Sequence, residues 1–96
     1  MNGIRFEWGS AKAATNKVKH GVTFDEAKSV FYDPRALAIN DPDHSLDGQR
    51  FIILGLSRVM RVLTAHRLRE AGDVIRIISA RKATANETET YIRRVR

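Results

Sequence analysis

Residues 74–91 constrain the fold more than any other part of the chain. The first half, residues 74–80, is mostly apolar and β-branched, which is typical of a buried strand. Thr84 and Glu87 then have the spacing of a capping box, in which each side chain satisfies a backbone N–H at the start of a helix. We therefore predict a buried strand at 74–80, a sharp turn, and a helix at 85–95.

Polar side chains with useful chemistry accompany this strand and helix. They are Arg76, Ser79, Arg81, Lys82 and Tyr91. Because side chains alternate along a strand, we expect Arg76 on one face of the sheet and Arg81 on the other. The stretch therefore predicts a cationic cluster at the edge of an apolar core.

Hydrophobic periodicity predicts the remaining elements. The pattern favours a strand at 3–8, helices at 11–20 and 24–32, and strands at 37–39, 51–56 and 59–66. We expect Ser10 to cap the first helix and Asp33-Pro34 to end the second. Turn residues dominate 40–48, and 68–73 reads as a hairpin loop. The last four strands, joined by short turns, should form an antiparallel meander. The order predicts an α+β domain, with two N-terminal helices and one C-terminal helix on a mainly antiparallel sheet.

Length and composition limit the class of protein. The 96 residues suffice for one domain, 1–96, with a modest core, and a hydrophobic content of 43% is ordinary for a globular chain. The absence of cysteine excludes a disulfide scaffold, a thiolate metal site and a cysteine nucleophile. No apolar run approaches the roughly 20 residues of a membrane span, and the first residues have no apolar signal core. We therefore expect a cytoplasmic protein.

Positive charge is concentrated in the second half of the chain. Residues 1–49 contain 6 basic and 7 acidic side chains, whereas residues 50–96 contain 11 basic and 4 acidic ones. This asymmetry, with a pI near 10, favours a polyanion or an acidic protein as partner over a basic surface that only confers solubility.

The sequence does not predict a metal site. His20, His44 and His66 are far apart, and the acidic run near Asp43 contains a proline and lacks the terminal glutamate of a calcium loop. We read that run as a polar loop, and we expect neither a metal nor a cofactor.

A metal-free basic site suits cleavage of RNA. The ribose 2′-OH must lose a proton and attack phosphorus, the 5′-oxygen must gain a proton, and guanidiniums can stabilise the charge that develops on the phosphoryl oxygens. The candidate phosphate ligands are Arg50, Arg67, Arg76 and Arg81, and the candidate proton carriers are His20, His66, Glu70 and Tyr91. We expect Lys19, Lys82 and His66 to contribute to substrate binding.

Most of these residues also have a purely structural interpretation. His66 could be a half-buried histidine with a hydrogen-bond partner, and His20 could simply favour a helix C-terminus. Arg81 could pair with Glu87 or Glu89, and Tyr91 could lie in the core with its hydroxyl at the rim. A purely structural interpretation fits Arg76 least well. A charge inside an apolar strand costs free energy unless it is paired or lies at a functional surface.

Many residues along the chain resemble the BrnT family of toxins. They are Phe6-Glu-Trp8, Lys12, Asn16, Lys19-His-Gly-Val22, Phe24, Glu26-Ala27, Val30-Phe31, Asp33-Pro34, Asp43-His44, Arg50 and Arg76-Ile-Ile-Ser-Ala-Arg81. The resemblance implies a RelE-like fold, ribonuclease activity that blocks translation, and a BrnA-type antitoxin that binds promoter DNA within the complex. It places the basic active surface on Arg50, Arg67, Arg76 and Arg81, with His20 and Tyr91 nearby.

Two positions depart from the family pattern. Gly9 stands where an aspartate usually follows the tryptophan, and Gln49 stands where a glutamate often precedes the strand arginine. Neither change removes a cation that we assign to phosphate binding.

Two hypotheses of different classes follow. The first is a metal-independent RNA endonuclease toxin of a type II toxin–antitoxin pair. The second is a non-catalytic module that binds nucleic acid or an antitoxin and acts as a co-repressor. Both hypotheses need the same arginines.

Overall fold

The computed structural model describes residues 4–40, 50–69 and 74–95. Within these ranges the elements are β1 Arg5–Glu7, α1 Ser10–His20, α2 Phe24–Val30, β2 Leu37–Asn40, β3 Arg50–Leu56, β4 Val62–Arg69, β5 Val74–Lys82 and α3 Ala85–Val95. The expected α+β class is confirmed. None of the described helices is long and apolar enough to cross a membrane.

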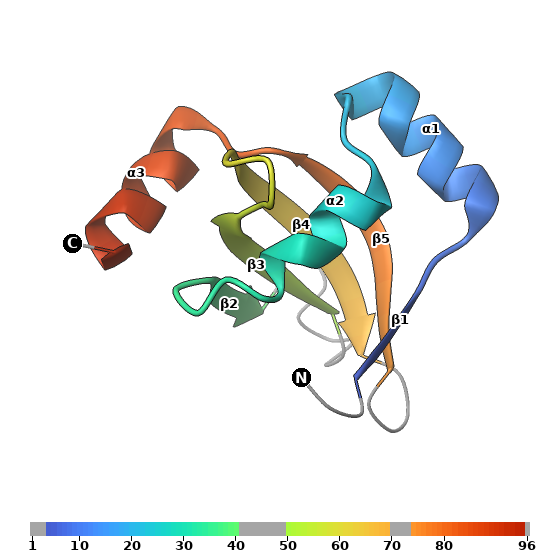
Figure 1. Cartoon of the computed structure of the whole chain (residues 1–96), viewed down its shortest axis with the longest axis horizontal. Helices are drawn as coiled ribbons and strands as arrows, with labels where there is room; N and C mark the ends of the chain where they lie inside the picture. The colour runs from blue at the N-terminus through green and yellow to red at the C-terminus, as the bar shows by residue number, and fades with distance from the viewer. Residues whose placement is uncertain (1–3, 41–49, 70–73, 96) are drawn as a thin grey trace.

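The strands form one mixed sheet in the order β1-β5-β4-β3-β2 (Figure 1). Strands β2 to β5 pair antiparallel with their neighbours, as the short turns between them predict. Strand β1 pairs parallel with β5, and Phe6 lies opposite Ile75. The first and last strands of the chain are therefore neighbours.

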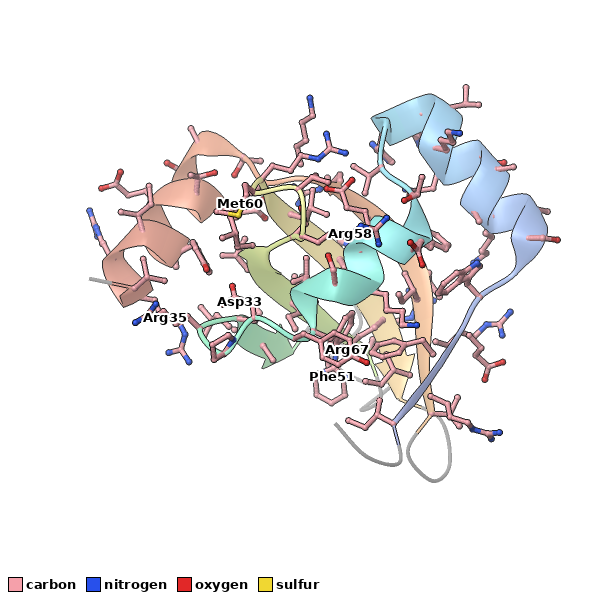
Figure 2. The ribbon with its side chains drawn as sticks, in the orientation of Figure 1. Asp33, Arg35, Phe51, Arg58, Met60 and Arg67 are labelled. Atoms are coloured by element: carbon pink, nitrogen blue, oxygen red, sulfur yellow. The ribbon has the colours of Figure 1, made fainter. Side chains whose placement is uncertain are left out.

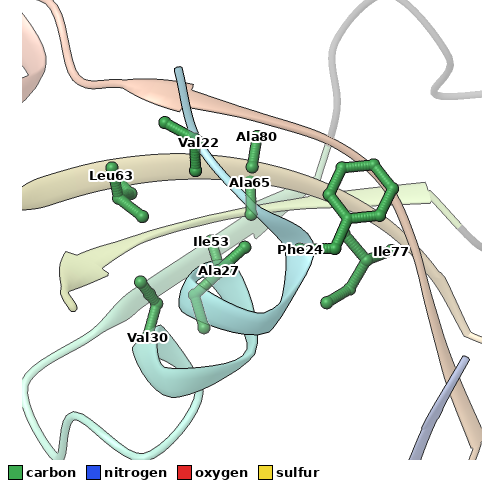
Figure 3. Packing of buried hydrophobic residues seen from close by; sticks show 9 residues of the cluster. All are labelled: Val22, Phe24, Ala27, Val30, Ile53, Leu63, Ala65, Ile77 and Ala80. Atoms are coloured by element: carbon green, nitrogen blue, oxygen red, sulfur yellow. The ribbon is translucent and has the colours of Figure 1, made fainter. Parts of the chain in front are cut away.

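The hydrophobic core lies between the sheet and α2 (Figure 3). Its helix-side members are Val22, Phe24, Ala27 and Val30, and its strand members are Ile53, Leu63, Ala65, Ile77 and Ala80. Helix α1 lies along β5 at one side of the sheet, and α3 contacts β3 and β4 (Figure 1). One face of the sheet is thus covered by α2, and the opposite face is bordered by α3.

The turn between β3 and β4 differs from the expected strand at 59–66. Ser57 N donates to Arg61 O and Met60 N donates to Ser57 O, both at 2.9 Å, so the chain reverses here and β4 begins only at Val62. Met60 adopts φ 68°, and its side chain is 75% exposed. The apolar residues of this segment are typical of a strand, but they lie at an exposed turn.

Other element boundaries also differ slightly from the expected ones. Ser10 is the first residue of α1, and Gly9, not Ser10, occupies the N-cap position. Helix α2 ends at Val30 rather than Tyr32, and β5 continues to Lys82. Most of the turn-rich run 40–48 and part of the loop 68–73 lie outside the described residues.

Glu26 fastens the β3–β4 turn to α2. Arg61 binds its carboxylate through Nε and Nη2 at 2.7 and 2.6 Å, and Ser57 Oγ donates to Oε2 at 2.7 Å. Only 8% of the Glu26 side chain is exposed. The hydrogen bonds from Arg61 lower the pKa of Glu26, so the carboxylate remains charged although it is buried.

Asn16 fastens α1 to the outer edge of β5. Its amide donates to Ala80 O at 2.8 Å and to Val22 O at 2.9 Å, and it accepts from Ala80 N at 3.1 Å. The buried side chain therefore bonds both backbone groups of Ala80, beyond the point where β1 stops pairing with β5.

Asp33 fastens the C-terminal half of α3. Its carboxylate accepts from the backbone N–H groups of Arg35 and Leu56, both at 2.9 Å, and from the Tyr91 hydroxyl at 2.5 Å. Burial and the bond to Asp33 raise the pKa of Tyr91 to about 12. Gly55 permits this approach, because a Cβ there would lie 3.2 Å from Asp33 Oδ2 and 2.9 Å from Val30 Cγ1.

Glu87 fastens the N-terminal end of α3 to the sheet. The capping box with Thr84 is confirmed, with backbone-to-side-chain bonds of 2.9 and 3.1 Å in the two directions. The same carboxylate accepts from Thr64 Oγ1 at 2.9 Å and from Arg81 through both terminal nitrogens at 2.7 and 3.0 Å. Hydrogen bonding to Arg81, the largest cause, lowers the pKa of Glu87 to about 2.

We predict that Asn16→Ala destabilises the fold by about 2–4 kcal/mol, because it leaves three buried backbone groups without their partner. Urea unfolding of the variant and of Lys17→Ala, a control on the exposed side of the same helix, measures the difference. Equal stability of the two variants would show that Asn16 does not fasten α1.

We predict that Glu87→Gln lowers the free energy of unfolding at pH 7 by about 1–2 kcal/mol, after discounting for solvent screening. The folded-state pKa of Glu87 lies below its unfolded value of 4.5, so its contribution is complete above about pH 5 and is lost as the pH falls towards 2. Urea titrations at pH 7 and pH 3 should therefore show the gap between wild type and variant narrowing at the lower pH.

The matched control for this prediction is Glu89→Gln. Glu89 lies on the same helix and pairs with Arg93 at 3.3 Å, with both side chains largely exposed. Its loss should change stability by less than about 0.5 kcal/mol. If the free energies of unfolding of wild type and Glu87→Gln differed by the same amount at pH 7 and pH 3, the role of the charged carboxylate would be contradicted.

Candidate nucleic-acid site on the open face of the sheet

The sheet face opposite α2, which we call the open face, carries most of the polar strand residues. The pairing register and strand alternation assign to it Arg50, Ile52, Leu54, Thr64, His66, Arg76, Ser79 and Arg81. The alternate residues, such as Ile53, Ala65 and Ile77, pack under α2 in the core. The open face is therefore where a ligand could reach strand side chains.

A β-bulge in β5 brings Arg76 and Arg81 to the same face. His66 lies opposite Ser79 and Arg67 lies opposite Ile77, so Ile78 is an extra residue in β5. Simple alternation predicts Arg76 and Arg81 on opposite faces, and this expectation is wrong because the extra residue reverses the alternation. Bulges of this kind often re-aim side chains beside functional sites.

The register also gives the spacing of the cations. Arg50 on β3 and Arg76 on β5 both lie opposite Leu68 of β4, so two strand spacings, about 10 Å, separate their Cα atoms. His66 lies two residues further along β4, at the next position on the same face, between Ile52 and Ser79. The structure thus brings a histidine and two arginines to neighbouring positions.

His66 is held by its neighbour on β5. Ser79 Oγ and His66 Nδ1 share a hydrogen bond of 3.0 Å, and both side chains are half-buried. This bond orients the imidazole, and an oriented imidazole can carry protons near neutral pH. The structural and the catalytic interpretations of His66 are both compatible with this geometry.

Arg76 and Arg81 each contact a carboxylate, but in different settings. Arg76 Nη1 lies 3.0 Å from Glu7 Oε2, at an exposed pair on β1 and β5. Arg81 donates two hydrogen bonds to Glu87, as the structural interpretation of Arg81 predicts. Since the pKa of Glu87 is about 2, that carboxylate is a very weak base at neutral pH.

Arg67 lies on the other face, together with α2. Its guanidinium carbon is 4.8 Å from the ring centre of Phe51 and 5.6 Å from that of Phe31 (Figure 2). Cations over aromatic faces at such distances stabilise packing. The structure therefore does not bring Arg67 together with Arg50, Arg76 and Arg81.

The other expected site residues are dispersed. Tyr91 is buried on the inner side of α3, where it donates to Asp33, and Lys82 is exposed at the end of β5. Lys19 and His20 lie in the last turn of α1, and both line a cavity against β5. They are therefore near the sheet edge rather than on the open face.

An apolar groove runs between the open face and α3. It has a volume of about 200 Å³ and is lined by Leu37, Ile39, Ile52, Leu54, Thr64, Asn86, Glu87 and Thr90. Ile39 is 49% exposed within it. Helix α3, held by Asp33 and Glu87, thus forms one wall of the candidate site.

The sequence does not indicate that Asp33 holds α3 through Tyr91 or that Lys12 lines the cavity beside α1. The sequence places Asp33 at the break after the second helix and within the family resemblance, and no local signal indicates that it binds Tyr91. The spacing of Lys12 from Lys19 and His20 was a usable signal, because residues seven and eight apart lie on one side of a helix. Within the described ranges, no group of three or more metal-ligating side chains is present.

Comparisons with known proteins bear on this geometry. Residues 8–87 match the family model described as the ribonuclease toxin BrnT of a type II toxin–antitoxin system. The crystal structure of the Brucella abortus ribonuclease toxin BrnT has a similar fold, with a TM-score of 0.68 and 18% sequence identity over 84% of this chain and 97% of that chain. A search of curated proteins finds no match. The chain belongs to the BrnT family of ribonuclease toxins of type II toxin–antitoxin systems.

Proposed function

We propose that this chain is a metal-independent endoribonuclease that cuts messenger RNA on the open face and so inhibits translation. The observation that carries the proposal is the bulge at Ile78, which places Arg76 on the same face as His66 and Arg50. The family is described as a ribonuclease toxin, which supports the class of reaction. The resemblance to BrnT toxins further supports a single, RelE-like domain.

The reaction needs two proton transfers and stabilisation of charge. A base removes the proton of the ribose 2′-OH, the 2′-oxygen forms a bond to phosphorus, and the bond to the 5′-oxygen breaks as an acid protonates it. The products are a 2′,3′-cyclic phosphate and a 5′-hydroxyl. We assign one proton transfer to His66, and we assign the binding of the phosphoryl oxygens to Arg50 and Arg76.

The remaining expected residues receive supporting roles. Arg81 holds Glu87, and therefore α3, in place. Tyr91 keeps the other half of α3 in place through Asp33. Lys19, Lys82 and His20 lie outside the open face and would contact the RNA strand beyond the cleaved bond. Arg67 would support β3 and β4 from the opposite face.

We predict that the wild-type protein cuts single-stranded RNA in the presence of EDTA and that Arg76→Ala lowers the rate about 10²- to 10³-fold. Gel analysis of labelled RNA, with detection of the cyclic phosphate end, measures both. The matched control is Arg58→Ala, because Arg58 is also exposed and paired with a carboxylate, Asp25 at 2.6 Å, but extends from the β3–β4 turn over α2 (Figure 2). The control should stay within about twofold of wild type.

The same experiment separates the rival function. The rival binding module needs the same arginines, Arg76 and Arg81, which both pair with glutamates, so cleavage itself must be tested. If the protein binds free RNA and ribosome-loaded message but cuts neither, the nuclease hypothesis is rejected in favour of the binding module. An Arg76→Ala protein that unfolds at the same urea concentration as wild type shows that the lost activity is not a folding defect.

The proposed partner is a BrnA-type antitoxin, with promoter DNA bound only through the complex. The type II toxin–antitoxin family implies an antitoxin, and the net charge of +6 favours an acidic partner surface. We expect a purified BrnA-type antitoxin to abolish cleavage, and we expect the toxin without it to show no footprint on promoter DNA. Full cleavage in a stable complex would contradict neutralisation by this partner.

A further inference from the structure

An open cavity lined in part by basic side chains lies between helix α1 and β5. The cavity has a volume of about 320 Å³ and is lined by Ala11, Lys12, Thr15, Asn16, Lys19, His20 and Ile78. Its two lysines come from one side of α1, since Lys12 lies seven residues, about two helical turns, before Lys19. Lys17 and Val18, on the same helix, do not line it.

The positive charge of this cavity is not balanced locally. Among the described residues, the ion pairs involve Arg58, Arg61, Arg76, Arg81 and Arg93, and neither Lys12 nor Lys19 takes part in one. The amide of Asn16 is committed to the backbone groups of Val22 and Ala80. Like charges that converge on a concave surface repel one another unless an anion lies between them.

The cavity adjoins the open face at two points. Ile78, the extra residue of the bulge, lines the cavity, and its neighbour Ser79 holds His66. At the start of α1, a Cβ on Gly9 would lie 3.7 Å from Arg76 Nη2, so the guanidinium of Arg76 reaches the beginning of this helix. Arg76 therefore lies between the open face and the cavity.

We propose that this cavity is a second phosphate-binding site for the same RNA strand. The strand would cross β5 from the open face, with one phosphate at Arg76 and a further phosphate between Lys12 and Lys19. This inference rests on the proposed ribonuclease function and specifies its substrate as a single strand longer than the nucleotides at the cleaved bond. Lysines suit the role, because a flexible ammonium group binds a phosphate as a point charge without requiring a fixed geometry.

The test measures binding of 2′-O-methyl RNA, which cannot be cut because its 2′-oxygens are blocked. We compare the Lys12→Ala/Lys19→Ala double variant with wild type, using fluorescence anisotropy of a twelve-nucleotide probe at several salt concentrations. Each lost phosphate contact should lower the slope of log K against log salt by roughly 0.7. Because the double variant loses the one phosphate contact of the cavity, we expect a slope change of about 0.7 and an affinity loss of tenfold or more at low salt.

The matched control is the Lys17→Ala/Lys28→Ala double variant, which removes the same charge outside the cavity. It should bind within about twofold of wild type with an unchanged slope, and a four-nucleotide probe should show a smaller loss for the cavity variant than the longer probe. Equal losses for the two double variants would overturn the inference, because net charge alone would then explain the effect.

The outcomes for the site and for the function remain distinguishable. If wild type cuts RNA in EDTA and the two double variants bind alike, the second phosphate site is refuted and the nuclease stands. If the wild-type protein cuts neither free nor ribosome-loaded RNA, the nuclease is refuted whatever the lysines do.

Discussion

One extra residue in β5 determines which side chains meet on the open face. Ile75 lies opposite Phe6, which packs against the core, and both Ile77 and Ala80 are fully buried, so residues of odd and even number must share the covered face. A regular strand cannot satisfy this pattern, because its side chains alternate strictly. It would bury a guanidinium, at a cost of several kcal/mol, or expose an isoleucine that gains about 2 kcal/mol from burial. The bulge at Ile78 avoids both costs and directs Arg76 and Arg81 to the same side.

Much of the basic half of the chain is used to hold the molecule together. Arg61 binds Glu26 and the carbonyl of Gly21, Arg81 binds Glu87, and Arg94 donates to Arg35 O at 2.9 Å. These arginines connect a turn or a helix to the rest of the fold, and the glutamates that bind Arg61 and Arg81 compensate the charges of those two side chains. The positive charge that remains available to bind a polyanion therefore lies on fewer residues than the composition suggests.

The local elements were predictable, because their signals are local. The capping box of Thr84 and Glu87 and the short turns between strands identified α3 and the meander directly from residue types. The parallel pairing of β1 with β5 was not predictable, since no short pattern indicates which edge a first strand joins. The bulge was not predictable either, because Ile78 looks like any other strand residue and its cause is the packing of Ile77 and Ala80.

The residue types of the candidate site are visible in the sequence, whereas their arrangement is not. In the sequence, Arg67 looks like the other arginines of the strands. Its contacts with Phe31 and Phe51 show that it belongs to the covered face. The pairing of Arg81 with Glu87 was one of two interpretations open from the sequence, and the structure shows that this bond forms.

The parallel pairing of β1 with β5 also sets the order in which a newly made chain can fold. Glu7 and Arg76 are 69 residues apart, and Asn16 bonds Ala80 over 64 residues. Contacts of such long range form late, because a large loop must close before they contribute. During synthesis the first strand and α1 have no edge to join until β5 has left the ribosome. The cationic surface that spans β5 and α1 is therefore completed only after β5 has been synthesised and has joined the sheet.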